Sequence, residues 1–434
     1  MTPAALLAAA ALVLAMPVGA TALTAGAATV ALRVPAGTPL AGYGAPERRL
    51  GFPDVLGRHP HAFWFRPHDG ALDAPAARAL VLDGGERVVW VTVDLIAVDQ
   101  AFTRAVAERL GADARGARLI VSASHTHSGP GAFMEVEVLA AVSVDRFDRQ
   151  VRDALVEDVA EAVRRAGRAA VPARIGSATA QTRGLTVARL DAPVDTELGV
   201  LKVVAETGAP IALVWNYAIH GTMLPPKNLH LSGDVMGLAS RELEARLRVP
   251  ALFVNGAVGD VSPLQHGHPA AEETARALAA AAREAWSRAT PAPATVVTAV
   301  ARVALPRPRL SLRNCVAAWM PRRLAIPLGV VLPREAELVA VAAGEAALVT
   351  VPGELQSQLG VAIKRAAPWK RTLIAGLSNE YLGYFVSAAD YERPSYVSCA
   401  SLYGAGGGES IVRQAGALLR TLRDRAEARA GDRR

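Results

Sequence analysis

The stretch Ser124-His125-Thr126-His127-Ser128-Gly129-Pro130-Gly131 lies at the centre of the predicted fold. It follows residues 118–123, an apolar run typical of a buried strand. Two histidines two positions apart at a strand end project to the same side, and the Gly and Pro residues then turn the chain. Imidazole is a common metal ligand and a common acid or base, so the cluster predicts a functional site in a strand-end loop. The alternative is a pair of loop histidines satisfied by backbone groups.

The composition favours a folded protein with a large core. Of the 434 residues 51% are hydrophobic and 20% are charged, which argues against global disorder and allows one large domain or two ordinary ones. The net charge of +7 comes from scattered arginines without a basic stripe interleaved with aromatics, so we expect no nucleic-acid partner. The two cysteines, Cys315 and Cys399, allow one disulfide, which their spacing does not decide. Without a Cys-x-x-Cys motif, any metal must use His and carboxylate ligands.

The first 32 residues carry no charge. Residues 4–16 are apolar and small residues follow, which is the pattern of a secretory signal without its usual basic start. We therefore predict a signal peptide or an N-terminal anchor over residues 1–28 and an exported protein, which is periplasmic, secreted or membrane-anchored. A buried N-terminal segment is the alternative.

Predicted strands alternate with predicted helices through most of the chain. Residues 79–82 and 88–94 are expected to pair around Asp83-Gly84-Gly85. Long helical patterns cover residues 101–110, 143–166, 234–248, 272–287, 355–365 and 410–428. Further strands are expected at 173–177, 198–204, 210–216, 251–254, 296–305, 335–341, 346–351 and 372–375. This order predicts an α/β fold, with mixed β-sheets, flanking helices and an active site in strand-end loops, in a single domain at residues 29–434 that closes with a helix.

Residues 306–333 interrupt this alternation. The segment is rich in proline and arginine and contains an apolar patch at residues 324–332. Two interpretations stay open, namely a loop that touches lipid or substrate and an ordinary long connection.

Three residues with metal-binding side chains each follow a predicted buried strand. These are His125, His220 and Glu354, and Pro352-Gly353 presents the glutamate at a turn. Two histidines and one carboxylate match a catalytic zinc site that keeps an open position. Their spacing does not show that they meet. Asn379 and Tyr384 lie in another strand-end loop, where the phenol of the tyrosine would bind the metal or form a hydrogen bond.

Several motifs together resemble the neutral/alkaline non-lysosomal ceramidase family. The matching blocks occur in the order of the family and span most of residues 38–404: His125-Thr-His-Ser-Gly-Pro-Gly131, Ala218-Ile-His220, Leu231-Ser-Gly-Asp234 with Gly237-Leu-Ala-Ser240, Gly259-Asp-Val-Ser-Pro263, Pro352-Gly-Glu354, and Gly376-Leu-Ser-Asn379 to Tyr384. The first block and Gly-Asp-Val-Ser-Pro are the specific ones. The longer members of the family end in an additional β-sandwich domain, which we expect to be absent here.

The resemblance implies roles for individual residues. It implies one zinc ion per chain, held by His125, His220, Glu354 and Tyr384. It assigns catalysis to Ser262, turns His127 toward the substrate rather than the metal, and assigns substrate contact to Tyr396. The arginine of the family that binds the substrate headgroup corresponds to Arg183 or Arg189, although the Arg-Ser-Pro block around it is missing.

These roles imply a zinc-dependent hydrolase that cleaves the N-acyl amide bond of ceramide or a related N-acyl lipid to a sphingoid base and a fatty acid. Zinc polarises a carbonyl and lowers the pKa of bound water to about 7, and a nearby His127 supplies the proton that the leaving amine needs. Ser262 attacks directly or stabilises the oxyanion. Asp234 and Asp260 orient ligands or serve as cap and turn residues.

A lipid amide and a membrane surface are the expected partners. The alternatives are a zinc hydrolase for a different amide or ester, and a non-catalytic secreted lipid-binding protein.

Overall fold

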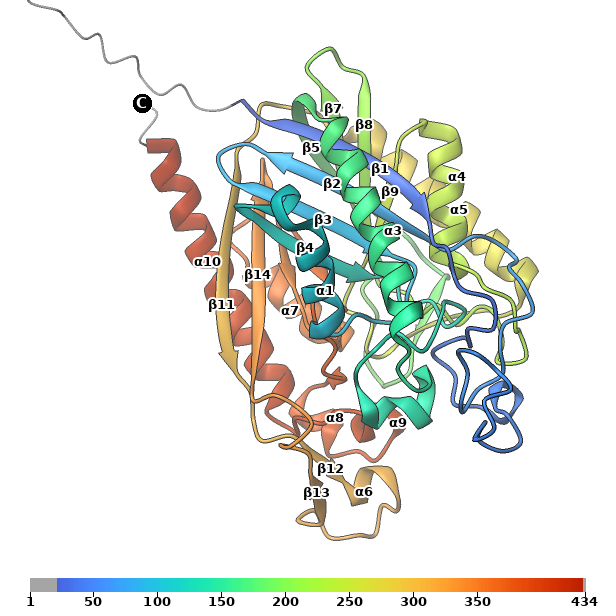
Figure 1. Cartoon of the computed structure of the whole chain (residues 1–434). Coiled ribbons are helices and arrows are strands. Elements are labelled where there is room, and N and C mark those ends of the chain that lie inside the picture. Colours follow the sequence, from blue (N-terminus) through green and yellow to red (C-terminus); the bar gives the residue numbers. More distant parts are fainter. Residues whose placement is uncertain (1–21, 432–434) are drawn as a thin grey trace, which may run out of the picture.

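The computed structural model describes residues 22–431, and its largest element is an eight-stranded mixed sheet (Figure 1). The strand order is β4-β3-β2-β1-β5-β7-β8-β9. The strands are β1 (Thr24–Ala31), β2 (Ala76–Asp83), β3 (Arg87–Val93), β4 (Ala117–Ala123), β5 (Val171–Gln181), β7 (Glu197–Ala205), β8 (Pro210–Tyr217) and β9 (Ala251–Asn255). The predicted hairpin is confirmed, since β2 and β3 pair antiparallel with Leu80 opposite Trp90.

A second sheet of four strands packs against one face of the first. Its strands, in the order β11-β14-β15-β17, are β11 (Val296–Ala304), β14 (Glu335–Ala343), β15 (Ala346–Thr350) and β17 (Arg371–Ala375). Buried side chains from both sheets, such as Leu82, Trp90 and Leu348, form one apolar cluster between them. The alternation of apolar residues along the strands supplies this core, because successive side chains point to opposite faces.

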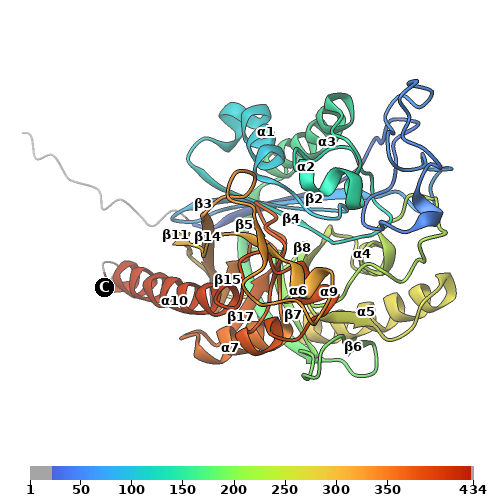
Figure 2. The same cartoon turned by 90° about the horizontal axis from the view of Figure 1, so that it is seen from below.

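Helices cover the outer faces of both sheets. The long helices are α1 (Gln100–Leu110), α3 (Arg149–Arg168), α4 (Asp234–Leu247), α5 (His268–Arg288), α7 (Ser357–Ala366) and α10 (Gly407–Gly431). Figure 2 shows α1 and α3 on one side of the strands and α7 and α10 on the other. Helices α4 and α5 share a further core cluster with strands β5 to β9. The predicted α/β class, with mixed sheets and flanking helices, is confirmed.

The helix predicted at 143–166 begins later than the apolar spacing indicated. Asp148 caps α3 by accepting hydrogen bonds from the backbone of Gln150 and Val151, so the helix starts at Arg149. The chain before it forms the short α2 (Glu137–Leu139) and the single π-helical turn η3 (Ala140–Val144). Asp145, at a φ of 68°, separates that turn from α3.

Strand β1 was not predicted, because its small residues continue the uncharged pattern of the N-terminus. It pairs along its whole length with β2 and begins at Thr24, so the predicted boundary at residue 28 falls inside a paired strand. Residues 1–21 of the predicted signal or anchor lie outside the described residues. None of the helices between residues 22 and 431 is long and apolar enough to cross a membrane.

The remaining short elements lie around the strand ends. They are η1 (Pro46–Arg48), η2 (Gly111–Ala114), β6 (Thr186–Ala188), β10 (Val261–Pro263), β16 (Glu354–Leu355), β18 (Tyr384–Phe385), α8 (Ala388–Tyr391) and α9 (Tyr396–Cys399). Residues 306–334, called here the apolar protrusion, carry β12 (Arg309–Ser311), α6 (Leu312–Cys315) and β13 (Ala325–Pro327). The protrusion extends from the lower end of the molecule in Figure 1, and the disulfide between Cys315 and Cys399 joins it to α9.

Candidate active site

Loops from both sheets meet at the ends of four buried strands. The loops after β4, β8, β15 and β17 carry, in chain order, His125, His220, Glu354 and Tyr384. Strands β8 and β9 are parallel, as are β15 and β17, so their carboxyl ends lie at the same edge. The two sheets are tied together there by Ser122 and Ser378, whose hydroxyl oxygens are 2.7 Å apart.

Asn255, at the end of β9, holds the two histidine loops together. Its side-chain amide donates to the backbone oxygen of Ser124 at 2.9 Å and to that of Ile219 at 3.0 Å. Each acceptor immediately precedes a histidine. Because buried carbonyls need a donor, these two bonds fix one loop relative to the other. Sequence reasoning assigned Asn255 no role, since its partners are distant along the chain.

The rings of His125 and His220 are held in the same way. Nδ1 of His125 donates to the backbone oxygen of Ile96 at 2.7 Å, and Nδ1 of His220 donates to that of Val261 at 2.8 Å. A carbonyl only accepts, so in each neutral ring Nε2 is the unprotonated nitrogen. His125 has a φ of 73°, so the extended geometry expected at the strand end does not continue through it. This left-handed turn nevertheless keeps its ring 5.1 Å from that of His127, between centroids.

Glu354 reaches the same place through a glycine-dependent turn. Gly353 has a φ of 155°, and a Cβ there would lie 2.3 Å from the backbone oxygen of Gly383. Only glycine fits this position. The turn leads into β16, which pairs in parallel with β18 and places Glu354 directly opposite Tyr384 in the register. This register brings Tyr384 beside the glutamate, as the predicted ligand set requires.

The structure brings three potential ligand atoms face to face. Oε2 of Glu354 lies 3.3 Å from Nε2 of His125 and 3.1 Å from Nε2 of His220. All three atoms are buried, and none makes a hydrogen bond. Buried polar atoms are normally paired, so three unpaired atoms that converge fit the donor set of a metal ion.

The charges around these atoms favour a negative Glu354 beside a neutral His220 ring. Burial raises the pKa of the Glu354 carboxyl, but the neighbouring histidines outweigh this and hold its pKa well below the ordinary value. Burial, with Arg189 and His125, lowers the pKa of His220 to about 3. An ionised carboxylate and two deprotonated imidazoles are the forms that bind a metal.

His127 belongs to the same cluster but is held differently. One ring nitrogen from each of His125, His127 and His220 falls within a group no more than 4.8 Å across. Both ring nitrogens of His127 are buried without a hydrogen bond, so no acceptor fixes its ring as the carbonyls fix the other two. A Cβ on Gly42 would lie 2.7 Å from this ring, which therefore needs a glycine beside it. Burial first, and then the other two histidines, lower the pKa of His127 well below its usual value, so its ring is neutral and one of its nitrogens is unprotonated.

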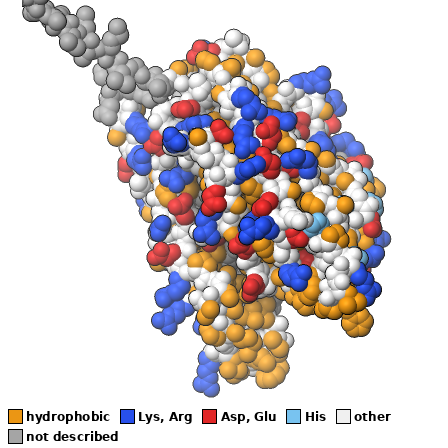
Figure 3. All heavy atoms as spheres, viewed as in Figure 1, with side chains coloured by type: hydrophobic (Ala, Val, Ile, Leu, Met, Phe, Trp, Pro, Cys, Tyr) orange, Lys and Arg blue, Asp and Glu red, His pale blue; other side chains and the backbone are white. Residues whose placement is uncertain are grey.

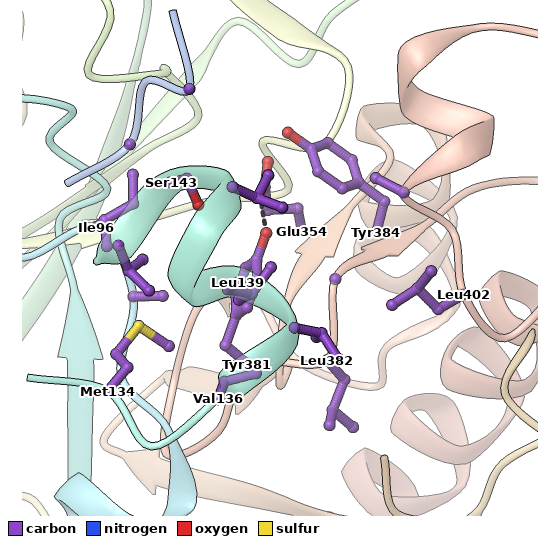
Figure 4. Close-up of a pocket in the computed structure, with 18 of the residues that line it drawn as sticks. Ile96, Met134, Val136, Leu139, Ser143, Glu354, Tyr381, Leu382, Tyr384 and Leu402 are labelled. Carbon is purple, nitrogen blue, oxygen red and sulfur yellow. Dashed lines mark hydrogen bonds between the residues drawn. The ribbon is translucent and has the colours of Figure 1, made fainter. Parts of the chain in front are cut away.

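Tyr381 is a site residue that sequence reasoning did not assign. Its hydroxyl donates to Oε1 of Glu354 at 2.8 Å, the dashed contact in Figure 4. This bond satisfies one carboxylate oxygen and leaves Oε2 turned toward the histidines. Burial, followed by the charge of Glu354, raises the pKa of Tyr381 well above its usual value, which keeps the phenol a donor. The sequence places Tyr381 between Asn379 and Tyr384, but no spacing rule indicates which tyrosine reaches the glutamate.

Ser262 lies in β10, which pairs with β6. Nε of Arg189 donates to its hydroxyl oxygen at 2.7 Å, and the backbone oxygen of Val261, the preceding residue, holds the ring of His220. Arg183, the other candidate for the headgroup arginine, is exposed before β6 and is not part of this contact. Of the two arginines that the motif left open, Arg189 is therefore the one at the site.

A cavity of about 550 Å³ lies against the cluster. His125, His127, Glu354 and Tyr384 form part of its wall. The rest is mainly aliphatic, and Figure 4 shows side chains that line it, including Ile96, Met134, Val136, Leu139, Leu382 and Leu402. Tyr396 also lines the cavity, with its ring 5.9 Å from that of Tyr384, and 70% of its surface is exposed. The site thus combines a polar corner with a long apolar wall.

The two aspartates considered as ligand-orienting groups serve the backbone instead. Asp234 accepts a hydrogen bond from the amide of Leu224 at 3.1 Å at the start of α4, and Asp260 accepts one from the amide of Ser357 at 2.7 Å at the start of α7. Backbone carbonyls, and not these carboxylates, orient the histidines. The turn and cap interpretation therefore describes both aspartates.

Comparison with known families gives this geometry a context. The family model for the N-terminal part of neutral/alkaline non-lysosomal ceramidases matches residues 69–295, which is more than half of the chain. The chain belongs to this family. The matched region contains His125, His220 and Ser262, whereas Glu354 and Tyr384 lie beyond it.

Individual ceramidases are similar over part of their length. Neutral ceramidase B of Dictyostelium discoideum is 27% identical over 44% of this chain, and neutral ceramidase 1 of Arabidopsis thaliana is 31% identical over 37% of it. These matches cover 31% and 23% of the two relatives. The crystal structure of neutral ceramidase from Pseudomonas aeruginosa superposes with a TM-score of 0.77, covering 93% of this chain and 75% of that one at 20% identity. Another similar structure is a ceramidase complexed with C2, at 19% identity. The ceramidase fold therefore extends over nearly the whole chain.

Proposed function

We propose that this chain is a zinc-dependent amidohydrolase that cleaves the N-acyl bond of ceramide or a related N-acyl lipid, releasing a sphingoid base and a fatty acid. The observation that carries the proposal is the convergence of Nε2 of His125, Nε2 of His220 and Oε2 of Glu354, all buried and unpaired, beside a mainly apolar cavity. Family membership supports the same reaction class.

The zinc ion would be held, one per chain, by His125, His220, Glu354 and Tyr384. Two imidazoles with oxygen ligands are a donor set that zinc accepts. When bound, zinc polarises the substrate carbonyl and makes a bound water acidic. Tyr381 acts as a positioning residue, because its bond to Oε1 directs the other glutamate oxygen toward the histidines.

His127 is proposed as the proton carrier. Its neutral ring stands in the cavity wall without a hydrogen bond to occupy either nitrogen. It therefore accepts a proton as the attack proceeds and returns it to the nitrogen of the leaving amine. We do not assign it as a ligand, because ligating histidines usually donate their second nitrogen to an acceptor and His127 has none.

Ser262 is proposed as the catalytic hydroxyl. Arg189 donates to its oxygen, which fixes the hydroxyl and favours negative charge developing on it. The arrangement suits a nucleophile and equally a group that stabilises the oxyanion. Arg189, already at this oxygen, is also better placed than Arg183 to meet the polar headgroup of the substrate.

The cavity is proposed to take a hydrocarbon chain of the substrate. An aliphatic wall next to a polar corner matches a lipid whose amide must reach the metal while its chain stays out of water. Tyr396, at the rim, would contact the substrate where it enters.

Export is proposed from the uncharged N-terminus and is supported by the disulfide between Cys315 and Cys399. Disulfides persist mainly in oxidising compartments. N-terminal sequencing of the protein from its native host tests this proposal, and soluble cytoplasmic protein that retains Met1 would contradict it.

The activity is tested by measuring zinc per chain and fatty-acid release together. Purified protein is assayed with a long-chain ceramide, a short soluble N-acyl amide and the matching ester, before and after removal of metal with a chelator and again after zinc is restored. We expect one zinc per chain and amide hydrolysis that is lost and recovered with the metal. Preferred ester turnover would support the other hydrolase, and lipid binding without turnover would support a lipid-binding protein.

A further inference from the structure

The largest group of exposed apolar side chains in the described residues lies in the apolar protrusion. Many of the large exposed hydrophobic residues between positions 22 and 431 lie in the apolar protrusion: Val316, Trp319, Leu324, Ile326, Val330 and Val331. Val330 is fully exposed and Trp319 is 81% exposed. In Figure 3 apolar side chains dominate the lobe at the lower end of the molecule. Contiguous apolar surface of this kind marks an interaction site.

The protrusion is continuous with the candidate active site. Leu310, Leu328 and Leu332 point from it into the wall of the cavity. On the other side of the opening, Val138 and Val142 both line the cavity and are exposed to solvent. The same apolar surface therefore runs from outside the molecule to the cavity wall.

The base of the protrusion is fixed to α9, the short helix that begins at Tyr396. The disulfide from Cys315 reaches Cys399, which itself lines the cavity. Nearby, the side-chain amide of Asn314 donates to the backbone oxygen of Tyr391 at 2.9 Å. A partner bound to the protrusion is thus held in a fixed position relative to the opening of the cavity.

A second exposed loop extends in the same direction. Phe52, Val55 and Leu56 are 87%, 78% and 72% exposed. In Figure 1 this blue loop lies in the lower part of the molecule, to the right of the protrusion labelled β12, β13 and α6. Two separate apolar loops at the same end of the molecule match a broad surface better than a single peptide or a small ligand.

The charge of the protrusion indicates the kind of surface. Residues 306–334 contain six arginines and no aspartate or glutamate. Arg322 and Arg323 follow Trp319 closely, and Arg322 is paired with Glu392 at 2.7 Å while Arg323 is exposed. Tryptophan beside arginine is the combination favoured where apolar and aqueous phases meet, and arginine is attracted to anionic headgroups.

We propose that the apolar protrusion, together with the loop at residues 51–57, docks on a lipid bilayer that contains anionic lipids, and that the lipid amide enters the cavity directly from that bilayer. The proposal rests on the proposed function for the identity of the substrate, but not for the binding itself. Docking would place the opening against the membrane, so a long-chain amide would move along apolar surface instead of crossing water.

The test is the partition of the full chain onto vesicles, with no turnover required. Wild type, Val330→Glu and Trp319→Ala are sedimented with vesicles of phosphatidylcholine alone and of phosphatidylcholine with phosphatidylglycerol. Val171→Glu is the matched control, because Val171 is 41% exposed at the start of β5, away from the cavity wall. We expect wild type to prefer the anionic vesicles and each protrusion variant to lose about tenfold or more in partition. The control should bind as wild type does.

Other outcomes would overturn the proposal. One is wild-type protein that binds neither kind of vesicle, and another is protrusion variants that bind as well as wild type. A third is a wild-type dimer that Val330→Glu converts to monomer, which would show that the surface binds a second copy of the chain. Hydrolysis of a short soluble amide is measured alongside. Such hydrolysis without vesicle binding would contradict docking alone, whereas vesicle binding without hydrolysis of any amide would contradict the proposed function alone.

Discussion

The cluster around Glu354 and the apolar protrusion are opposite departures from ordinary protein structure. In the cluster, polar atoms are buried without partners. In the protrusion, large apolar side chains are exposed without cover. Each arrangement is unfavourable in a protein that binds nothing, and each is relieved by a partner of matching chemistry, a cation in one case and a lipid phase in the other. The comparison predicts that substitutions in the two regions affect different measurements.

The largest effect is expected for His220→Ala. The variant removes one of the converging nitrogens and the ring fixed by Val261, so we expect loss of tightly bound zinc and of activity to background while the circular dichroism spectrum stays native. His268→Ala, at an exposed histidine at the start of α5, is the control and should retain both. A full equivalent of tightly held zinc in His220→Ala would exclude the proposed ligand set.

Removing the proposed catalytic groups should separate turnover from metal binding. His127→Ala is expected to lower the rate by about 10²–10⁴-fold, as for other proton carriers. Ser262→Ala is expected to lower it by about 10²–10³-fold, as for loss of an oxyanion donor. Both should keep one zinc per chain by elemental analysis, with exposed Ser287→Ala as a neutral comparison. Near wild-type rates in both variants would refute these roles and leave the zinc site standing.

A smaller effect is expected for Tyr381→Phe, which keeps the ring but removes the hydrogen bond to Oε1 of Glu354. Loss of such a supporting contact typically costs about 10–100-fold in metal affinity or activity. Zinc affinity is measured by competition with a chelator. Tyr403→Phe, which removes a hydroxyl bonded to the backbone oxygen of Pro333, is the comparison and should leave zinc affinity unchanged. Equal affinities for both variants would mean that Glu354 needs no support from Tyr381.

The smallest effect on folding is expected in the protrusion. Val330 is fully exposed, so Val330→Glu should change the free energy of unfolding by less than about 0.5 kcal/mol, as for most surface substitutions. Denaturant unfolding measures this directly. A clearly larger loss would show that the protrusion packs against the protein, and the contrast between the two regions would then disappear.

Much of the fold was predictable from local patterns. The hairpin of β2 and β3, the capped helices and the buried strands follow from periods of two and 3.6 residues, which depend only on neighbours in the chain. The two places where the structure differs from these predictions also have local causes. Strand β1 consists of small residues without contrast, and the apolar spacing before α3 continues through a turn that Asp148 and Asp145 end.

Within the site, the sequence named His125, His220 and Glu354 because each stands where a buried strand ends. It also placed Ser262 and Tyr384 through the motifs of the family. It did not distinguish Arg189 from Arg183, and it gave no role to Tyr381 or Asn255. Those three choices depend on contacts between segments far apart in the chain, which no spacing encodes.

The sequence by itself thus determined the α/β class, the family and the kinds of side chain that stand at the strand ends, because local periodicity and short motifs carry that information. Only the tertiary structure decided which atoms meet. The crossing of the two sheets brings Glu354 to the histidines, Asn255 binds their loops together, and the protrusion is held beside the cavity by a bond to Cys399. The physical reason is that convergence depends on the packing of whole sheets, whereas each strand end is set by a few neighbouring residues.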